Sequence, residues 1–173
     1  MRVLLGAFGD PGHAFPMLAL GRALRTRGHE VTLQTWERWR EDAVREGLTF
    51  AAAPEYHVFP TQERPLKPYE AVFRATGETR ELVRDVAPDV LVSDILTLAP
   101  ALAGELEGVP VATLVPHVDP RFEPGWPPYS VGARLPRTAL GRAGWRLLDP
   151  LVGRGLDLGQ RELDETRRRL GLA

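Results

Sequence analysis

The sequence contains no cysteine. Disulfides, thiolate nucleophiles and zinc-thiolate sites are therefore excluded, and cysteine usage does not reveal the compartment. Neither sign of charge is in excess, because the formal net charge is −1, which argues against nucleic acid or a charged membrane surface as a partner. Long apolar runs are missing too. Asp94, Glu105 and Glu107 interrupt the longest candidate for a membrane span.

The N-terminus leaves no room for a targeting segment, since Met1 and Arg2 lead directly into a predicted strand. We therefore expect a soluble cytoplasmic protein without a membrane span. Hydrophobic residues make up 43% of the 173 residues, so a single domain with a packed core is expected over residues 1–173.

The first 35 residues predict a β-α-β unit. Residues 3–5 form a short apolar run with no polar face, which is typical of a strand covered on both sides. Residues 9–12 contain two glycines and a proline that end this strand. Helical spacing follows, with Pro16 expected in the first helical turn and Gly28 at the C-terminal end. A second strand is predicted at 31–33.

The rest of the chain continues the alternation of strands and helices. Helices are predicted at 36–46, 69–86, 96–107, 138–152 and 156–170, strands at 48–53, 88–94 and 108–115, and proline-rich loops at 54–68 and 116–136. Such alternation implies a parallel sheet with right-handed crossovers. The predicted class is α/β, a Rossmann-like doubly wound parallel sheet of order 3-2-1-4-5, with extra C-terminal helices.

Two ionisable residues follow or end strands that this order makes neighbours. His13 follows the first strand and Asp94 ends the fourth, so both are expected at the switch-point crevice where open α/β sheets bind ligands. A carboxylate that accepts the imidazole N–H fixes the tautomer and stabilises the imidazolium. The other ring nitrogen can then act as a general base.

Structural explanations remain open for both residues. His13 can be a capping or solvent-facing residue, and Asp94 can cap the helix that follows it. A dinucleotide fingerprint is excluded, because the glycines of the first turn are three residues apart and the second strand ends in Gln34-Thr35. P-loop, Gly-x-Ser-x-Gly and His-Glu-x-x-His motifs are absent as well.

Two segments match one family. The first reads Gly-His-x-x-Pro at 12–16, then Leu-x-Leu-x-x-x-Leu-x-x-x-Gly-His-x-Val-Thr at 18–32. The second reads Pro-Asp-Val-Leu-Val-Ser-Asp at 88–94, followed by a helix and Gly-Val-Pro at 108–110. Together they resemble the N-terminal half of GT-B glycosyltransferases. The nearest groups are family 1 and the related family 28, especially bacterial enzymes that glycosylate natural products such as macrolides.

The resemblance implies a role for each matching residue. His13 would be the general base that deprotonates an acceptor hydroxyl, and Asp94 would hold it, so that the sugar is transferred with inversion. The small-molecule acceptor, largely apolar, would be bound by this half of the enzyme. The implied acceptor-binding residues are Gly12, Phe15, Tyr56, Phe59, His117, Phe122, Trp126 and Tyr129. No metal and no cofactor is implied, and the nucleotide sugar is a co-substrate.

The resemblance also shows departures. A complete GT-B enzyme has a second α/β domain that carries most of the donor site, so we expect a C-terminal donor-binding domain in cis or as a separate subunit. Without it the chain is expected to be inactive. Asp10-Pro11 replaces a simpler small-residue loop before Gly12. A non-catalytic ligand-binding module and an unrelated Rossmann-like nucleotide-binding domain remain as alternatives. Trp126 and Tyr129 can equally be loop anchors.

Overall fold

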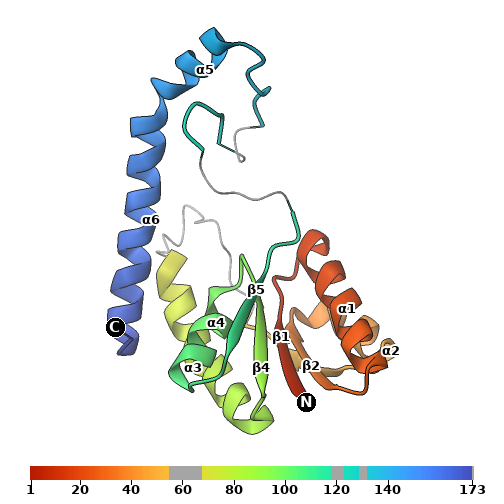
Figure 1. Cartoon of the computed structure of the whole chain (residues 1–173). Helices are drawn as coiled ribbons and strands as arrows, with labels where there is room; N and C mark the ends of the chain where they lie inside the picture. Colours follow the sequence, from red (N-terminus) through yellow and green to blue (C-terminus); the bar gives the residue numbers. More distant parts are fainter. Residues whose placement is uncertain (55–67, 118–122, 129–131, 173) are drawn as a thin grey trace. The chain divides into compact units, whose positions relative to one another are not determined.

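The structure is a computed structural model that describes residues 1–54, 68–117, 123–128 and 132–172 (Figure 1). These residues form two compact units, 1–116 and 117–171. The single domain predicted from the sequence therefore contains two units, each with its own packing. The first unit carries the sheet, and the second carries the helices that follow it in the chain.

The first unit is built on a five-stranded parallel sheet of order β3-β2-β1-β4-β5, which confirms the predicted order. Its strands are β1 (Arg2–Gly6), β2 (Glu30–Thr35), β3 (Thr49–Ala52), β4 (Val90–Asp94) and β5 (Val111–Leu114). In the register, Leu5 of β1 pairs with Leu33 of β2 and Val92 of β4. The winding reverses between β1 and β4, so the loops after these two strands meet.

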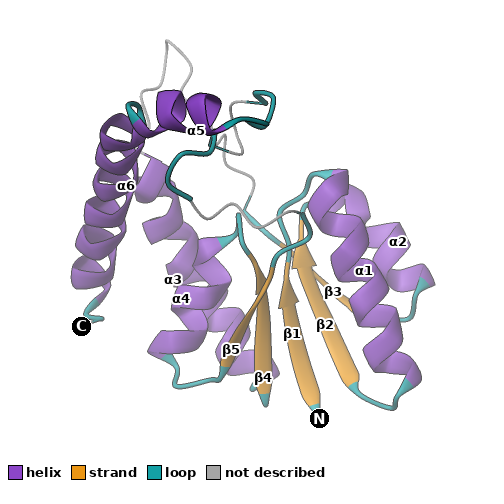
Figure 2. Ribbon diagram, turned by 45° about the horizontal axis from the view of Figure 1, so that its top comes forward, coloured by secondary structure: helices purple, strands orange, loops and turns teal. Residues whose placement is uncertain are grey.

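Helices cover both faces of the sheet (Figure 2). Helices α1 (Pro11–Thr26) and α2 (Arg40–Arg45) lie on one face, and α3 (Pro68–Val86) and α4 (Leu98–Leu106) lie on the other. Strand side chains alternate between two cores, with Leu5 packed on the α1 side and Leu4 on the α3–α4 side. Burying each of these leucines contributes about 1.5–3 kcal/mol. Gly28 follows α1 with φ +81°, as its predicted place at the helix end requires.

Pro16 lies deeper in α1 than predicted. The helix begins at Pro11, so Pro16 is inside it rather than in its first turn. The carbonyl that would accept a Pro16 N–H belongs to Gly12, which is exposed, so water can satisfy it. Pro11 takes the first helical position, where a missing N–H costs nothing.

The segment after β2 is not the single helix predicted at 36–46. It begins with a 3-10 turn, η1 (Glu37–Trp39), in which the Trp39 N–H donates to the Trp36 carbonyl at 3.0 Å, and α2 follows. Trp39 is 8% exposed, so its burial against the first unit, rather than helix propensity, sets the local geometry.

The second unit contains α5 (Ala139–Arg146) and α6 (Asp149–Leu170). The single helix predicted at 138–152 was wrong, because helix α5 ends at Arg146 and residues 147–148 form a turn. Helix α6 begins at Asp149, seven residues before the predicted start at 156. Pro150 explains the break. It fits the first turn of α6, but in a continuous helix it would remove a hydrogen bond to Arg146 and clash with that carbonyl. In the ranges described above, no helix has both the length and the apolar character needed to cross a bilayer.

Candidate active site

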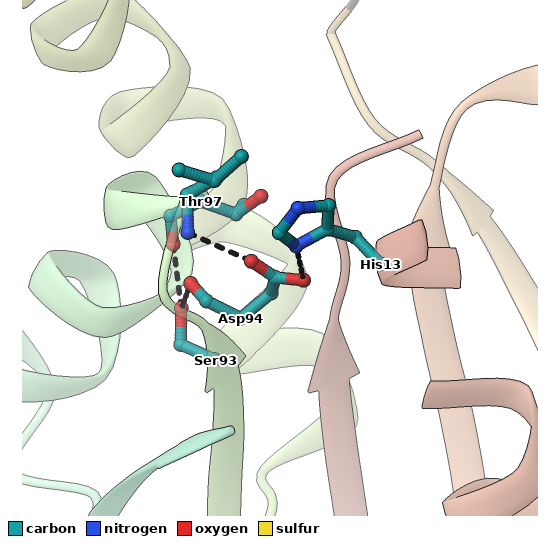
Figure 3. A network of polar contacts seen from close by, with 5 residues as sticks. His13, Ser93, Asp94 and Thr97 are labelled. Carbon is teal, nitrogen blue, oxygen red and sulfur yellow. Dashed lines mark hydrogen bonds and ion pairs between the residues drawn. The ribbon is translucent and has the colours of Figure 1, made fainter. Parts of the chain in front are cut away.

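His13 and Asp94 meet where the carboxyl ends of β1 and β4 lie side by side. His13 is in the first turn of α1, and Asp94 is the last residue of β4. The His13 Nδ1 atom lies 2.7 Å from the Asp94 Oδ2 atom (Figure 3). The His13 side chain is 13% exposed and that of Asp94 is 0% exposed. Because an ionised carboxylate only accepts hydrogen bonds, Nδ1 donates, and this fixes the tautomer of the ring.

The loop after β4 holds Asp94 through its own hydrogen bonds. The Leu96 N–H donates to the second carboxylate oxygen of Asp94 at 2.7 Å, and the Thr97 N–H donates to the Asp94 carbonyl at 2.9 Å. The buried Ser93 hydroxyl donates to the Thr97 carbonyl at 2.5 Å. Figure 3 shows this turn next to the imidazole. Both oxygens of the buried carboxylate are thus partnered, as burial of a charge demands.

Asp94 does not occupy the helix-cap position that the sequence left open for it. The N-cap of α4 is Thr97, whose side chain makes no capping bond. The Asp94 carboxylate instead bonds the N–H two residues ahead and the imidazole of His13. This arrangement joins two loops that are 81 residues apart in sequence.

Aromatic rings that follow β1 and β2 pack next to His13. The Phe8 ring meets the imidazole edge-on at 6.1 Å between ring centroids, with planes at 89°. Phe8 in turn packs against Trp36 at 5.0 Å. Such edge contacts are favourable geometry for aromatic pairs.

The loop between β1 and α1 is also bonded from the η1 turn. The Gly9 carbonyl accepts a hydrogen bond from Trp39 Nε1 at 2.8 Å and a second, short one from the Arg38 guanidinium. Arg38 also lies 3.6 Å from the Asp10 carboxylate. Sequence reasoning missed Trp36, Arg38 and Trp39. The available signal was a run of donors and rings directly after β2, the strand next to β1.

The known proteins that this chain resembles in sequence and fold include glycosyltransferases. The L-demethylnoviosyl transferase of Streptomyces niveus is 32% identical over 126 residues, which cover 64% of this chain and 33% of that protein. The solved structure of SsfS6, a glycosyltransferase of Streptomyces sp. SF2575, matches with a TM-score of 0.51 at 25% identity, over 65% of this chain and 38% of that one. Spinosyn rhamnosyltransferase SpnG matches with a TM-score of 0.51 at 27% identity, over 69% and 36%. No protein-family model matches the chain.

The chain is homologous to part of the GT-B glycosyltransferases. Its α/β sheet and C-terminal helices match one half of that fold. It spans about a third of the length of the first curated relative it matches. The resemblance inferred from the two sequence segments is therefore confirmed at the level of fold and homology.

Two of the acceptor residues implied by the GT-B resemblance lie near His13 in sequence. Gly12 is exposed, and a Cβ added there would meet nothing within 4 Å. Phe15 is 58% exposed and packs edge-on against Trp39 at 5.0 Å. Phe15 lines a groove between α1 and α2, together with Arg22 and Asp42. Its side chain therefore belongs to the outer face of α1, away from the imidazole.

The other implied acceptor residues lie elsewhere or outside the described residues. His117 and Trp126 belong to the second unit. Trp126 lines an open cavity of about 690 Å³ there, with Arg134 and Arg137 among its neighbours. Tyr56, Phe59, Phe122 and Tyr129 lie outside the described residues.

A small cavity lies at the carboxyl ends of β1 and β2, against α3 and α4. It measures about 20 Å³, and Phe8, Trp36 and Thr97 are among its lining residues. This volume admits about one water molecule, which is too little for an acceptor. Within the described ranges, no three His, Asp or Glu side chains gather as a metal site would require.

Proposed function

We propose that this chain is the acceptor-binding half of an inverting glycosyltransferase. The observation that carries the proposal is the bond between the His13 imidazole and the buried Asp94 carboxylate at the switch point of a GT-B half. A histidine held by one nitrogen on a carboxylate is suited to take a proton at the other. The homology to L-demethylnoviosyl transferase and to the SsfS6 glycosyltransferase supports the reaction class.

The proposed reaction uses both nitrogens of the His13 ring. The Nε2 atom of His13 takes the proton of an acceptor hydroxyl as the hydroxyl oxygen attacks the anomeric carbon of the donor. The bond between that carbon and the diphosphate breaks, and its electron pair leaves with the diphosphate. Attack opposite the leaving group inverts the anomeric configuration. Asp94 stabilises the imidazolium that forms, because the proton on Nδ1 faces its carboxylate.

The donor is a nucleotide sugar with a diphosphate leaving group. A structure of SsfS6 complexed with thymidine diphosphate supports this choice. Most of the donor site would come from a second α/β half, in cis or as a separate subunit, since the chain spans only part of its relatives. The acceptor is a small, largely apolar molecule with a free hydroxyl.

The test is a transfer assay on protein that carries this chain together with a donor-binding half. A panel of nucleotide sugars is combined with a panel of apolar hydroxyl compounds. We expect a glycosylated product whose anomeric configuration is opposite to that of the donor. A product with retained configuration would contradict the proposal.

A binding measurement separates the two halves. We expect the 173-residue chain alone to bind acceptors and to bind nucleotide sugars only weakly in calorimetry. Micromolar affinity for a nucleotide sugar would refute the division of labour. Acceptor binding without any transfer, even with the donor half present, would favour a ligand-binding module.

A further inference from the structure

We infer that Arg38 is a positioning residue for His13. The geometry points to a clamp of Trp36, Arg38 and Trp39 that fixes the start of α1, and through it the distance between the imidazole and Asp94. Only the kinetic part of its test rests on the proposed function.

The clamp holds the loop before α1 through its contacts with Gly9. The Gly9 carbonyl takes two donors at once, Trp39 Nε1 and the guanidinium of Arg38. Gly9 is buried against Trp36 so closely that an added Cβ would lie 2.0 Å from the indole ring. The guanidinium itself lies over both rings, with its carbon 5.1 Å from the Trp36 centroid and 5.5 Å from that of Trp39. A planar, stacked guanidinium holds a fixed orientation in a way that a lysine cannot.

Asp10 connects the clamp to the backbone of His13. Asp10 is the N-cap of α1, yet its side chain makes no capping bond. Its carboxylate lies 3.6 Å from the Arg38 guanidinium instead. The Asp10 carbonyl accepts hydrogen bonds from the N–H groups of His13 at 3.0 Å and Ala14 at 2.9 Å. Arg38 therefore contacts the residue whose peptide anchors the backbone of His13.

The hydrogen bond between His13 and Asp94 tolerates only a small displacement of the first turn of α1. The bond from His13 to Asp94 is 2.7 Å long, so a displacement of the first turn by about 1 Å breaks it. A misplacement of that size can cost about a hundredfold in rate. The ion pair of Arg38 and Asp10 is exposed, at 49% and 59%, and exposed pairs add little to stability. Arg38 thus matters more for the position of His13 than for folding.

The experiment compares Arg38→Met with the matched control Arg40→Met. Arg40 lies two residues further on, is similarly exposed, and pairs with Glu37 and the Phe50 ring. The first readout is the ¹⁵N spectrum of the His13 ring in the 173-residue chain, which reports the tautomer without requiring activity. The second is kcat and KM for the acceptor in protein that also carries a donor-binding half. Thermal unfolding is measured in parallel.

We expect Arg38→Met to lose the fixed tautomer with a proton on Nδ1 and to lower kcat by about tenfold or more. KM for the acceptor should change less than about threefold, and Arg38→Lys should be intermediate because it keeps the charge but not the fork. A ring spectrum and kcat for Arg38→Met that match those of Arg40→Met would overturn the inference. If Arg38→Met does not fold, Arg38→Lys decides by the same two readouts. Absence of transfer in the unaltered protein would count against the proposed function, while the ring spectrum would still judge the clamp.

Discussion

The β4–α4 loop that follows Asp94 is held by its own residues, whereas the β1–α1 loop that precedes His13 is held by side chains that follow β2. In the first loop, Ser93, Asp94 and Leu96 close a turn within four residues of one another. In the second, Arg38 and Trp39 reach Gly9 across about 30 positions of sequence. The two loops meet in one bond.

The two loops show two ways in which a chain can position a residue of a site. The Asp94 turn needs only its local sequence and a place at the end of β4. The loop before His13 depends on residues that follow the neighbouring strand β2, because its supports are tertiary contacts. Substitutions in the two loops should therefore have different consequences, and the following variants test that contrast.

Asp94→Asn should have the largest effect on activity among these variants, because it acts where the loops meet. We expect kcat to fall by about ten- to a hundredfold, less than when the base itself is removed. The asparagine oxygen can still accept from the Leu96 N–H, so the fold is retained. Its amide would donate to His13 Nδ1 and force the proton onto Nε2. The ¹⁵N spectrum of the ring and kcat measure both effects.

The matched control is Asp89→Asn. The Asp89 carboxylate accepts the Arg2 N–H at 2.7 Å, at the amino ends of β1 and β4 and thus at the opposite end of these strands from His13, so ring spectrum and rate should be unchanged. Cooperative unfolding of Asp94→Asn under conditions where the control is folded would instead make Asp94 a structural residue.

Among these variants, Gly9→Ala should lower the free energy of unfolding most, because Trp36 leaves no space for a side chain at position 9. The new Cβ would overlap the Trp36 ring at 2.0 Å, and overpacking of this kind costs about 1–3 kcal/mol. Gly12→Ala, three residues further on in the first turn of α1, is the control, since nothing lies within 4 Å of its added Cβ. Urea unfolding of both variants measures the difference. Equal free energies of unfolding for the two variants would show that the Trp36 ring moves aside at little cost.

Much of the fold could be predicted because its signals are local. The apolar run at 3–5 predicted a buried strand, the segment at 88–94 predicted the fourth strand, and Gly28 marked the end of α1. The meeting of His13 with Asp94 followed from sheet order alone, before any side chain was placed. These inferences depend on periodicity and topology, which a single sequence carries.

The rest depended on contacts that no local pattern encodes. The η1 turn forms because Trp39 is buried, and its indole N–H donates to the Gly9 carbonyl in the loop after β1. The grip of Arg38 on Gly9 is equally non-local. Pro150, by contrast, carried a usable signal, because a proline favours a first helical turn over a helix interior.

Ser93→Ala tests the self-contained turn and should have a moderate effect. Removing the hydroxyl leaves the buried Thr97 carbonyl without this donor, which costs about 1 kcal/mol. Thr26→Ala is the exposed counterpart, because the Thr26 hydroxyl also donates to a carbonyl four residues away. We expect that control to stay within about 0.5 kcal/mol. A Ser93→Ala variant as stable as Thr26→Ala would show that the turn does not depend on the hydroxyl.

Glu107→Gln should change stability least among these variants. Glu107 belongs to neither of the two loops. Hydrogen bonds from Arg84 and Arg80 hold the pKa of Glu107 below its ordinary value of 4.5. A carboxylate whose folded pKa is lowered adds stability above its ordinary pKa and loses it as the pH falls through the folded value. The gap in melting temperature between wild type and variant should be small at pH 7 and shrink below pH 4.5. A gap that widens on acidification would contradict this sign.

His13, held on Asp94, is the proposed base of the sugar transfer. The most direct measurement is kcat of His13→Ala in protein carrying this chain and a donor-binding half, with His29→Ala at the far end of α1 as control. We predict a loss of about two to four orders of magnitude for His13→Ala and none for the control. A loss of less than about tenfold would contradict the claim.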